Sequence, residues 1–241
     1  DIERDTILKI ATLGEISIPE GILTTKKTQK TVDKHPTGVI RIDQIPSDVL
    51  KASLLSFAKS VATKGIDSDA EYRAGRDLLL RNNPRLSTQT TGNLVLPNEE
   101  TSAAAIRICK GLNNSILPIQ GPPGTGKSHT GAEMIVELAK SGKRVGVTAI
   151  SHKVIRGLLE KALKSAKKKS FNLKVVDKTS SKSSSPPTGL EEESDNTKAL
   201  LALDDGKVVG ATAWLWARED AIEKLDYLFV DEAGQMSLAM V

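Results

Sequence analysis

The eight residues GPPGTGKS, at positions 121–128, constrain the fold more than any other stretch of the chain. They fit the pattern G-x-x-x-x-G-K-[S/T], in which glycines let the backbone turn tightly so that successive N–H groups face one phosphate-sized hollow. The apolar stretch ILPIQ precedes them, and an amphipathic segment follows. A strand, a glycine-rich turn and a helix in this order predict a phosphate-binding loop, to which the helix N-terminus adds its positive dipole end.

Two residues of this loop have specific expected tasks. Lys127 is placed to reach the β- and γ-phosphates of a nucleoside triphosphate, and Ser128 to offer its hydroxyl to Mg²⁺. We therefore predict that the chain binds ATP together with Mg²⁺. The residues expected to contact the nucleotide are Gly121, Pro122, Pro123, Gly124, Thr125, Gly126, Lys127, Ser128 and His129.

A second, acidic motif lies far along the chain in the sequence YLFVDEAGQ, residues 227–235. Its hydrophobic part reads as a strand that delivers Asp231 to the carboxyl edge of a sheet, where ligands bind in parallel α/β folds. We expect Asp231 to hold Mg²⁺, and Glu232 to orient or deprotonate an attacking water. Together with the phosphate loop, the acid pair predicts a site for nucleoside triphosphate hydrolysis.

Strands and helices alternate from about residue 96 onward. The expected helices cover about 98–112, the segment SHTGAEMIVELAKSG and the segment HKVIRGLLEKALKSAKK, and the expected strands are RVGVTAI, VVGAT and YLFVD. Such alternation indicates right-handed crossovers. We predict an α/β fold of the P-loop NTPase type, with a mostly parallel sheet and helices on both faces, over residues 96–241.

Residues 1–95 differ in composition and pattern from residues 96–241. We interpret them as a smaller α+β accessory segment, first β-rich and then helical. The candidate strands are TILKIATL and TGVIRI, separated by a polar stretch rich in lysine and threonine. One helix is expected between Ser47 and Gly65. A second helix should begin at Ser68, where Glu71 completes a capping box.

The net charge of +4 is concentrated locally, because residues 161–182 hold eight lysines and one aspartate. This segment indicates either a phosphate-rich partner or solvated lysines beside a loop. It overlaps residues 167–198, whose low-complexity composition predicts a mobile insertion into the ATPase domain.

Several remaining features concern the cellular setting. The single cysteine, Cys109, excludes an internal disulfide and a cysteine metal cluster, and we expect a buried thiol. No apolar run approaches the ~20 residues that a membrane span needs. The N-terminus has neither an initiator methionine nor a signal-peptide pattern. We interpret the sequence as part of a longer protein and expect it in the cytoplasm. Association with the nucleoid is compatible with that location.

The motifs GPPGTGKS, VGVTAISHK, VVGATAWLW and VDEAGQ, in this order, resemble the first motor domain of superfamily 1 helicases. The resemblance covers about residues 95–241 and is strongest to the branch that contains the nonsense-mediated-decay RNA helicase, including proteins that join a RecB-like nuclease to a helicase. It implies a RecA-like domain in which ATP hydrolysis is coupled to translocation on single-stranded nucleic acid, with DNA favoured over RNA.

The resemblance also implies roles for individual residues. Gln235 would sense the γ-phosphate and link it to movement. Four residues lie where the family contacts the nucleic-acid backbone: Thr148, Ser151, His152 and Thr212. Ser102 stands near the place of the family's adenine-reading glutamine, which puts base selectivity in doubt. The arginines that a second RecA-like domain supplies are absent from this chain, so we expect ATP·Mg binding with slow hydrolysis and no unwinding.

Two other functional classes fit parts of the pattern. A hexameric AAA+ ATPase also carries GPPGTGK, although it usually has its acidic strand closer to the loop. A nucleotide-gated nucleic-acid-binding module without helicase activity would need only the binding half of the chemistry. Trp214 and Trp216 fit either base stacking or core packing.

Overall fold

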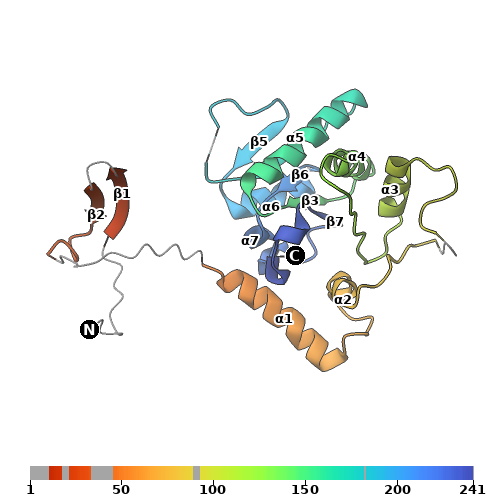
Figure 1. The fold of residues 1–241 in the computed structure, drawn as a ribbon, viewed down its shortest axis with the longest axis horizontal. Helices are drawn as coiled ribbons and strands as arrows, with labels where there is room; N and C mark the ends of the chain where they lie inside the picture. Colours follow the sequence, from red (N-terminus) through yellow and green to blue (C-terminus); the bar gives the residue numbers. More distant parts are fainter. Residues whose placement is uncertain (1–10, 18–21, 34–45, 89–92, 182, 241) are drawn as a thin grey trace. The chain divides into compact units, whose positions relative to one another are not determined.

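The computed structural model describes residues 11–17, 22–33, 46–88, 93–181 and 183–240. The chain divides into two compact units, Asp1–Ile45 and Pro46–Val241. In the first unit, β1 (Ala11–Ser17) and β2 (Ile22–Lys27) pair as an antiparallel hairpin (Figure 1). The β2 strand occupies the polar stretch that the sequence reading left between strands, while the expected strand TGVIRI lies outside the described residues.

The second unit holds the remaining elements. The helices are α1 (Asp48–Lys64), α2 (Arg73–Leu80), α3 (Thr101–Lys110), α4 (Lys127–Lys140), α5 (His152–Lys168), α6 (Asn196–Asp204) and α7 (Ala213–Trp216), with 3-10 turns η1 (Glu219–Ala221), η2 (Ala233–Gln235) and η3 (Leu238–Met240). The strands are β3 (Val145–Thr148), β4 (Val175–Lys178), β5 (Leu190–Glu193), β6 (Val208–Gly210) and β7 (Tyr227–Val230). Both α1 and α2 fall in the same compact unit as the sheet.

The five strands of this unit form one parallel sheet in the order β5-β4-β6-β3-β7. All four residues of β3 are buried, because a strand lies on each side of it and helices cover both faces. The strand β7 lies at one edge and is only partly buried. The chain therefore has the α/β fold of a P-loop NTPase, as the alternation of elements predicted.

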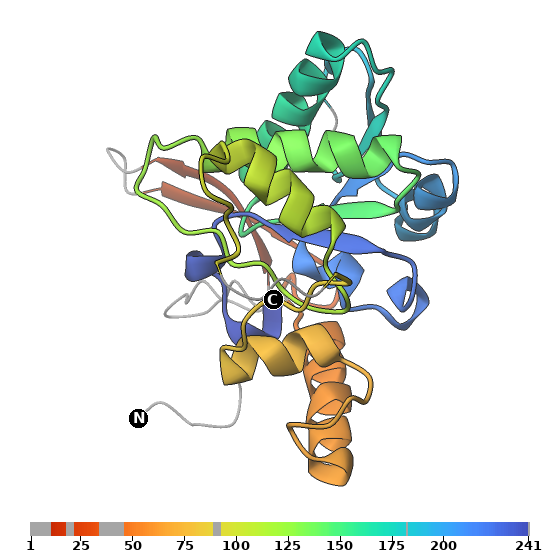
Figure 2. The same cartoon turned by 90° about the vertical axis from the view of Figure 1, so that its right-hand side faces the viewer.

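Neighbouring residues of a strand point to opposite faces of the sheet, and the buried side chains follow this rule. Val175 and Val208 belong to a core cluster with α4 and α5. Val176 and Val209, one position later, belong to a second cluster with α6 and α7. The helices α4 and α5 therefore cover one face of the sheet, and α6 and α7 cover the other (Figures 1 and 2).

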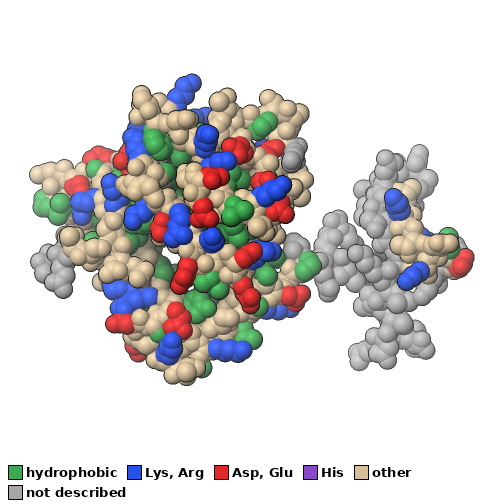
Figure 3. Space-filling view, turned by 180° about the vertical axis from the view of Figure 1, so that it is seen from behind, with side chains coloured by type: hydrophobic (Ala, Val, Ile, Leu, Met, Phe, Trp, Pro, Cys, Tyr) green, Lys and Arg blue, Asp and Glu red, His purple; other side chains and the backbone are tan. Residues whose placement is uncertain are grey.

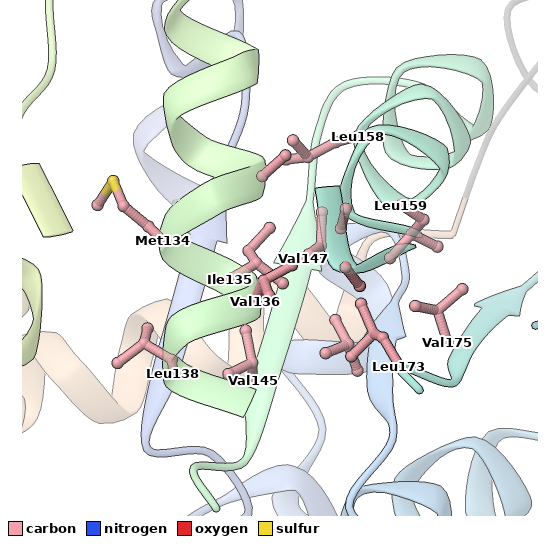
Figure 4. Close-up of a cluster of buried hydrophobic side chains, with 14 of the residues drawn as sticks. Met134, Ile135, Val136, Leu138, Val145, Val147, Leu158, Leu159, Leu173 and Val175 are labelled. Atoms are coloured by element: carbon pink, nitrogen blue, oxygen red, sulfur yellow. The ribbon is translucent and has the colours of Figure 1, made fainter. Parts of the chain in front are cut away.

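The packing of α4 and α5 onto the sheet is tight. Figure 4 shows Ile135 and Val136 of α4 gathered with Val147 of β3 and Leu159 of α5. A Cβ on Gly210 of β6 would lie 2.7 Å from Leu159 Cδ1, so the absence of a side chain at this position permits the close approach of α5. This layer holds α4 and α5 against the sheet.

Residues 167–198, whose composition predicted a mobile insertion, contribute two strands, β4 and β5, to the sheet. Arg156 of α5 forms an ion pair with each of these strands. Its Nε donates to Asp177 Oδ2 of β4 at 2.8 Å, and its Nη2 pairs with Glu192 of β5. Both carboxylates are buried, so the guanidinium compensates charges that would otherwise be costly inside the protein.

Two local predictions differ from the structure. The stretch ILPIQ before the phosphate loop forms no regular strand, although Leu117 packs against the core. The helix α2 begins at Arg73 rather than Ser68, and Tyr72 precedes it in the left-handed conformation with φ 61°. Since the Ser68 hydroxyl donates to the carbonyl of Gly65, the expected capping box does not form.

The cysteine and tryptophan residues are parts of the packed structure. Cys109 is 3% exposed, and burial raises the pKa of its thiol to about 12. The indole of Trp216 donates to the carbonyl of Ala211 at 3.1 Å and packs against the α6–α7 cluster. The indole of Trp214 donates to the carbonyl of Pro46 at 2.7 Å. These contacts support core packing for Trp216, whereas Trp214 is partly exposed and hydrogen-bonds to Pro46.

The surface mixes charges of both signs. On the face drawn in Figure 3, lysine and arginine side chains lie among aspartate and glutamate side chains. No helix within the described part of the chain is both long enough and apolar enough to cross a membrane.

Candidate nucleotide-binding site

The loop of residues 121–126 enters α4 through two glycines with positive φ. Gly124 has φ 82° and Gly126, the residue before the helix, has φ 89°. A residue with a side chain would be strained in either place. Gly121 is restricted for another reason, because a Cβ there would lie 2.8 Å from Thr125 Oγ1. The glycines of the motif are thus required by the shape of the loop.

The loop leaves a set of backbone donors without protein acceptors. Among the described residues, no acceptor is found for the N–H groups of Gly124, Gly126, Lys127 and Ser128. By contrast, the N–H groups of His129 and Thr130 donate to the carbonyl of Gly126 at 2.8 and 2.9 Å. Unpaired N–H groups at a loop and helix start form an anion-binding site. The residues present therefore fit the phosphates of a nucleotide.

Lys127 is held over this loop. Its Nζ donates to the carbonyl of Gly121 at 2.5 Å and to that of Pro122 at 3.0 Å. The carbonyl of Pro122 also accepts from the Thr125 hydroxyl at 2.8 Å. The ammonium group thus stays beside the unpaired N–H groups, where phosphate oxygens would replace the carbonyls as its acceptors.

The acid pair follows β7. The N–H of Glu232 donates to Asp231 Oδ1 at 3.0 Å, and the amide of Gln235 donates to Glu232 Oε2 at 3.3 Å. Glu232 adopts the left-handed conformation with φ 55°, which turns the chain directly into η2. The structure therefore brings together Asp231, Glu232 and Gln235, the three residues that the sequence assigned to this motif.

The phosphate loop and the acid pair both lie at the carboxyl-terminal end of the parallel strands. β7 pairs with β3 in parallel, and the N–H of Asp231 donates to the carbonyl of Thr148 at 2.9 Å. α4 ends shortly before β3 begins, so its N-terminus and the phosphate loop lie toward the carboxyl end of β3. Among the described residues, no hydrogen bond or ion pair joins residues 121–129 to the acid pair.

A magnesium site would be completed by the nucleotide. No group of three or more histidine, cysteine, aspartate or glutamate side chains that could hold a metal occurs in the described residues. Mg²⁺ is commonly held by one or two carboxylates, water and substrate phosphates. The hydroxyl of Ser128, which is half-buried at the start of α4, and the carboxylate of Asp231 fit that arrangement.

The residues expected to contact nucleic acid occupy different environments. Thr148 is 1% exposed and its hydroxyl has no partner, so this placement argues against a direct contact through that hydroxyl. Ser151 caps α5 by accepting from the N–H of Val154 at 3.4 Å. His152 is exposed in the first turn of the same helix, and Thr212 is half-buried at the start of α7.

Ser102 and His129, two further positions singled out from the sequence, have specific contacts in the structure. The Ser102 hydroxyl donates to Glu100 at 2.5 Å, and Glu100 also caps α3 by accepting from the N–H of Ala103. Ser102 therefore participates in a helix cap. The ring of His129 lies 3.7 Å from the carboxylate of Glu133 and is 60% exposed.

A comparison with known families agrees with this geometry. Residues 98–196 match a family model described as an AAA domain. The family is found in superfamily 1 helicase-like proteins. The match includes the phosphate loop, β3, α5 and both strands of residues 167–198, and it ends before the acid pair. No curated protein sequence matches the chain. The family match and the fold support a nucleotide-binding domain of the P-loop ATPase type in this region, in agreement with the motifs.

The sequence signalled the nucleotide half of this site clearly and the rest weakly. The interactions of Arg156 with β4 and β5 were missed, because nothing in a local pattern connects an arginine on a helix with carboxylates on distant strands. One signal was available, since Asp177 interrupts an apolar strand and a carboxylate there needs a cation.

Proposed function

We propose that this chain is the ATP-binding part of a superfamily 1 helicase motor, in which ATP hydrolysis drives translocation on single-stranded nucleic acid. The observation that carries the proposal is the parallel pairing of β3 with β7. This pairing puts Asp231 and Glu232 beside β3, which leads into residues 148–153, TAISHK. The phosphate loop lies toward the same end of β3. A change at the nucleotide can therefore reach the segment that the helicase resemblance assigns to nucleic acid.

In this proposal the protein's own residues have distinct tasks. The N–H groups of the loop and the ammonium of Lys127 hold the phosphates. Ser128 and Asp231 hold Mg²⁺, which neutralises negative charge on the phosphates when it is bound. Glu232 orients the attacking water or takes its proton, and Gln235 fixes the Glu232 carboxylate through its hydrogen bond.

Single-stranded nucleic acid is the proposed partner, with DNA favoured over RNA. A nucleotide-gated binding module uses the same residues for binding and differs only in lacking productive hydrolysis. A hexameric AAA+ ATPase is less well supported, because the matched family occurs in superfamily 1 helicase-like proteins despite its AAA description.

The proposal is tested by measuring how a nucleotide changes the binding of a labelled single-stranded oligonucleotide. We expect ATP·Mg to change the affinity by about 5- to 150-fold, the range of typical coupling between two sites. Lys127→Ala should abolish that change. Identical affinities with and without nucleotide, under conditions in which the nucleotide is bound, would contradict the proposal.

Two further measurements separate the alternatives. Hydrolysis of ATP that rises when the oligonucleotide is added, however slow it is, supports the motor over the gated module. Formation of a closed ring on addition of ATP, measured by sedimentation, would support the AAA+ alternative instead.

A further inference from the structure

A basic hollow lies between α4 and the C-terminal half of α5. Its volume is about 470 Å³. The side chains that line it are His129, Lys161, Lys164, Ser165, Lys167 and Lys168. We call this site the α4–α5 hollow. It is separate from the strand ends to which the helicase resemblance assigns nucleic acid.

The hollow brings together four lysines of α5 that have no acidic partners among the described residues. Lys161, Lys164, Lys167 and Lys168 are exposed, and none forms an ion pair with a described residue. The next residue, Lys169, pairs with Glu137 at 2.8 Å. Several ammonium groups close together repel one another, and a bound polyanion relieves this repulsion.

The helix dipole explains only part of this arrangement. Cations are favourable in the last turn of a helix, where Lys167 and Lys168 lie. Lys161 and Lys164 lie before that turn, yet they line the same hollow. On α4, Glu137 pairs with Lys169 at 2.8 Å, and the carboxylate of Glu133 lies 3.7 Å from the ring of His129.

The spacing of the lysines suits a phosphodiester backbone. Residues 161–168 extend over about 10 Å at 1.5 Å per helical residue. One strand of a nucleic-acid duplex carries a phosphate every ~3.4 Å along the axis. A row of this length can face more than one phosphate of a single strand. His129, in the first turn of α4, belongs to the helix that begins at the phosphate loop, so the hollow and the nucleotide site share one rigid element.

We propose that the α4–α5 hollow binds the sugar–phosphate backbone of the nucleic acid, through contacts of its lysines with phosphates. This inference rests on the proposed function and adds a second contact surface to it. Because lysine–phosphate contacts carry no sequence information, the hollow contributes affinity without base preference.

The test replaces three lysines of the hollow, Lys161→Gln, Lys164→Gln and Lys168→Gln, in one variant. The control variant removes the same charge at exposed lysines elsewhere, Lys51→Gln, Lys59→Gln and Lys198→Gln. Binding of labelled single-stranded DNA and RNA oligonucleotides of mixed sequence is measured by fluorescence anisotropy at several salt concentrations. Circular dichroism on heating establishes that both variants are folded.

We expect the hollow variant to bind both oligonucleotides at least about tenfold more weakly at low salt, and the control variant to bind as the unmodified protein does. The slope of log K against log salt should fall by about 2, since each phosphate contact in a single strand contributes ~0.7. Equal binding by the two variants would overturn the inference. So would unchanged oligonucleotide binding combined with a loss of binding to anionic phosphatidylserine vesicles, which would assign the hollow to a membrane surface.

These outcomes are distinct from a failure of the proposed function. If the oligonucleotide affinity of the unmodified protein did not respond to ATP·Mg, the proposed function would fail. The comparison between the hollow variant and its charge-matched control would still decide whether the lysines contact the nucleic acid.

Discussion

The backbone N–H of Asp231 donates a hydrogen bond to the carbonyl oxygen of Thr148 at 2.9 Å. This bond continues the parallel ladder that pairs β7 with β3 and fixes the acid pair at the end of β3, an interior and fully buried strand. The position of Asp231 is therefore set by the core of the domain. A carboxylate held in this way is preorganised for a metal ion and for the water that Glu232 would orient.

Replacing Asp231 with asparagine should weaken the Mg²⁺-dependent part of nucleotide binding. The backbone bond to Thr148 survives the substitution, so the loss reports on the carboxylate. If Asp231 holds the ion through water, the loss of affinity for Mg²⁺ should be about 10- to 100-fold. Nucleotide titrations with Mg²⁺ and with EDTA measure the effect.

Asp226, just before the other end of β7, provides a matched control. Its carboxylate pairs with Arg144, which lowers its pKa, and accepts from the Arg144 N–H at 2.7 Å. Asp226→Asn should reduce stability without changing the Mg²⁺ dependence. If Asp226→Asn and Asp231→Asn had equal effects on Mg²⁺ dependence, the assignment of Asp231 would be wrong.

Arg156→Ala should destabilise the domain by about 3–5 kcal/mol, because it removes the guanidinium that pairs with two buried carboxylates, Asp177 and Glu192. The loss is measured from the midpoint of urea unfolding at an unchanged m-value. Arg218→Ala removes an exposed pair with Asp220 and should cost no more than about 1 kcal/mol. An equal loss of unfolding free energy in the two variants would contradict the proposed role of the Arg156 ion pairs in stabilising β4 and β5.

Cys109 should resist alkylation in the folded protein. Its thiol is buried, and burial raises its pKa to about 12, so almost no thiolate is present at pH 8. Because the chain has a single cysteine, the labelling rate reports this site alone. We expect labelling by iodoacetamide to become complete only in urea. Rapid labelling of the native protein would show that α3 opens readily.

The carboxyl of Glu99 should titrate well below its ordinary range. Arg107 donates to Glu99 at 2.7 Å, and this bond lowers the pKa from 4.5 to about 2. A depressed carboxyl pKa stabilises the folded state above pH 4.5, and the contribution is lost as the pH falls from 4.5 through about 2.

Carbon NMR of the Glu99 carboxyl during an acid titration measures this pKa directly. In Arg107→Ala it should return toward 4.5. A value near 4.5 in the unmodified protein would show that the pair with Arg107 is not maintained in solution.

The sequence predicted the elements whose patterns are local. The periodicity of α4 and α5 and the apolar runs of β3, β6 and β7 were sufficient, because burial on one or both faces leaves a clear mark on such segments. The phosphate loop was recognisable for the same reason, since its glycines are required by local backbone shape.

The sequence did not predict features that depend on distant partners. β4 and β5 were hidden in a lysine- and serine-rich region, because what holds them is Arg156 and the neighbouring strand β6. ILPIQ is apolar enough for a strand, yet strand pairing needs a neighbour and none pairs with it among the described residues. The start of α2 depends on the left-handed Tyr72, whose ring meets Phe57 of α1 edge to face.

The most direct test of the account is a titration of a fluorescent ATP analogue with Mg²⁺ into this chain, into Lys127→Ala and into Lys143→Ala. Lys143 is an exposed lysine beyond the other end of α4 and serves as the control. We predict saturable binding with a micromolar dissociation constant for the unmodified protein and the control. Lys127→Ala should bind about 10- to 150-fold more weakly, because it loses charge-assisted hydrogen bonds of ~1.5–3 kcal/mol. Equal affinity for all three proteins, or no binding by any of them, would contradict the assignment of residues 121–128 as the nucleotide site.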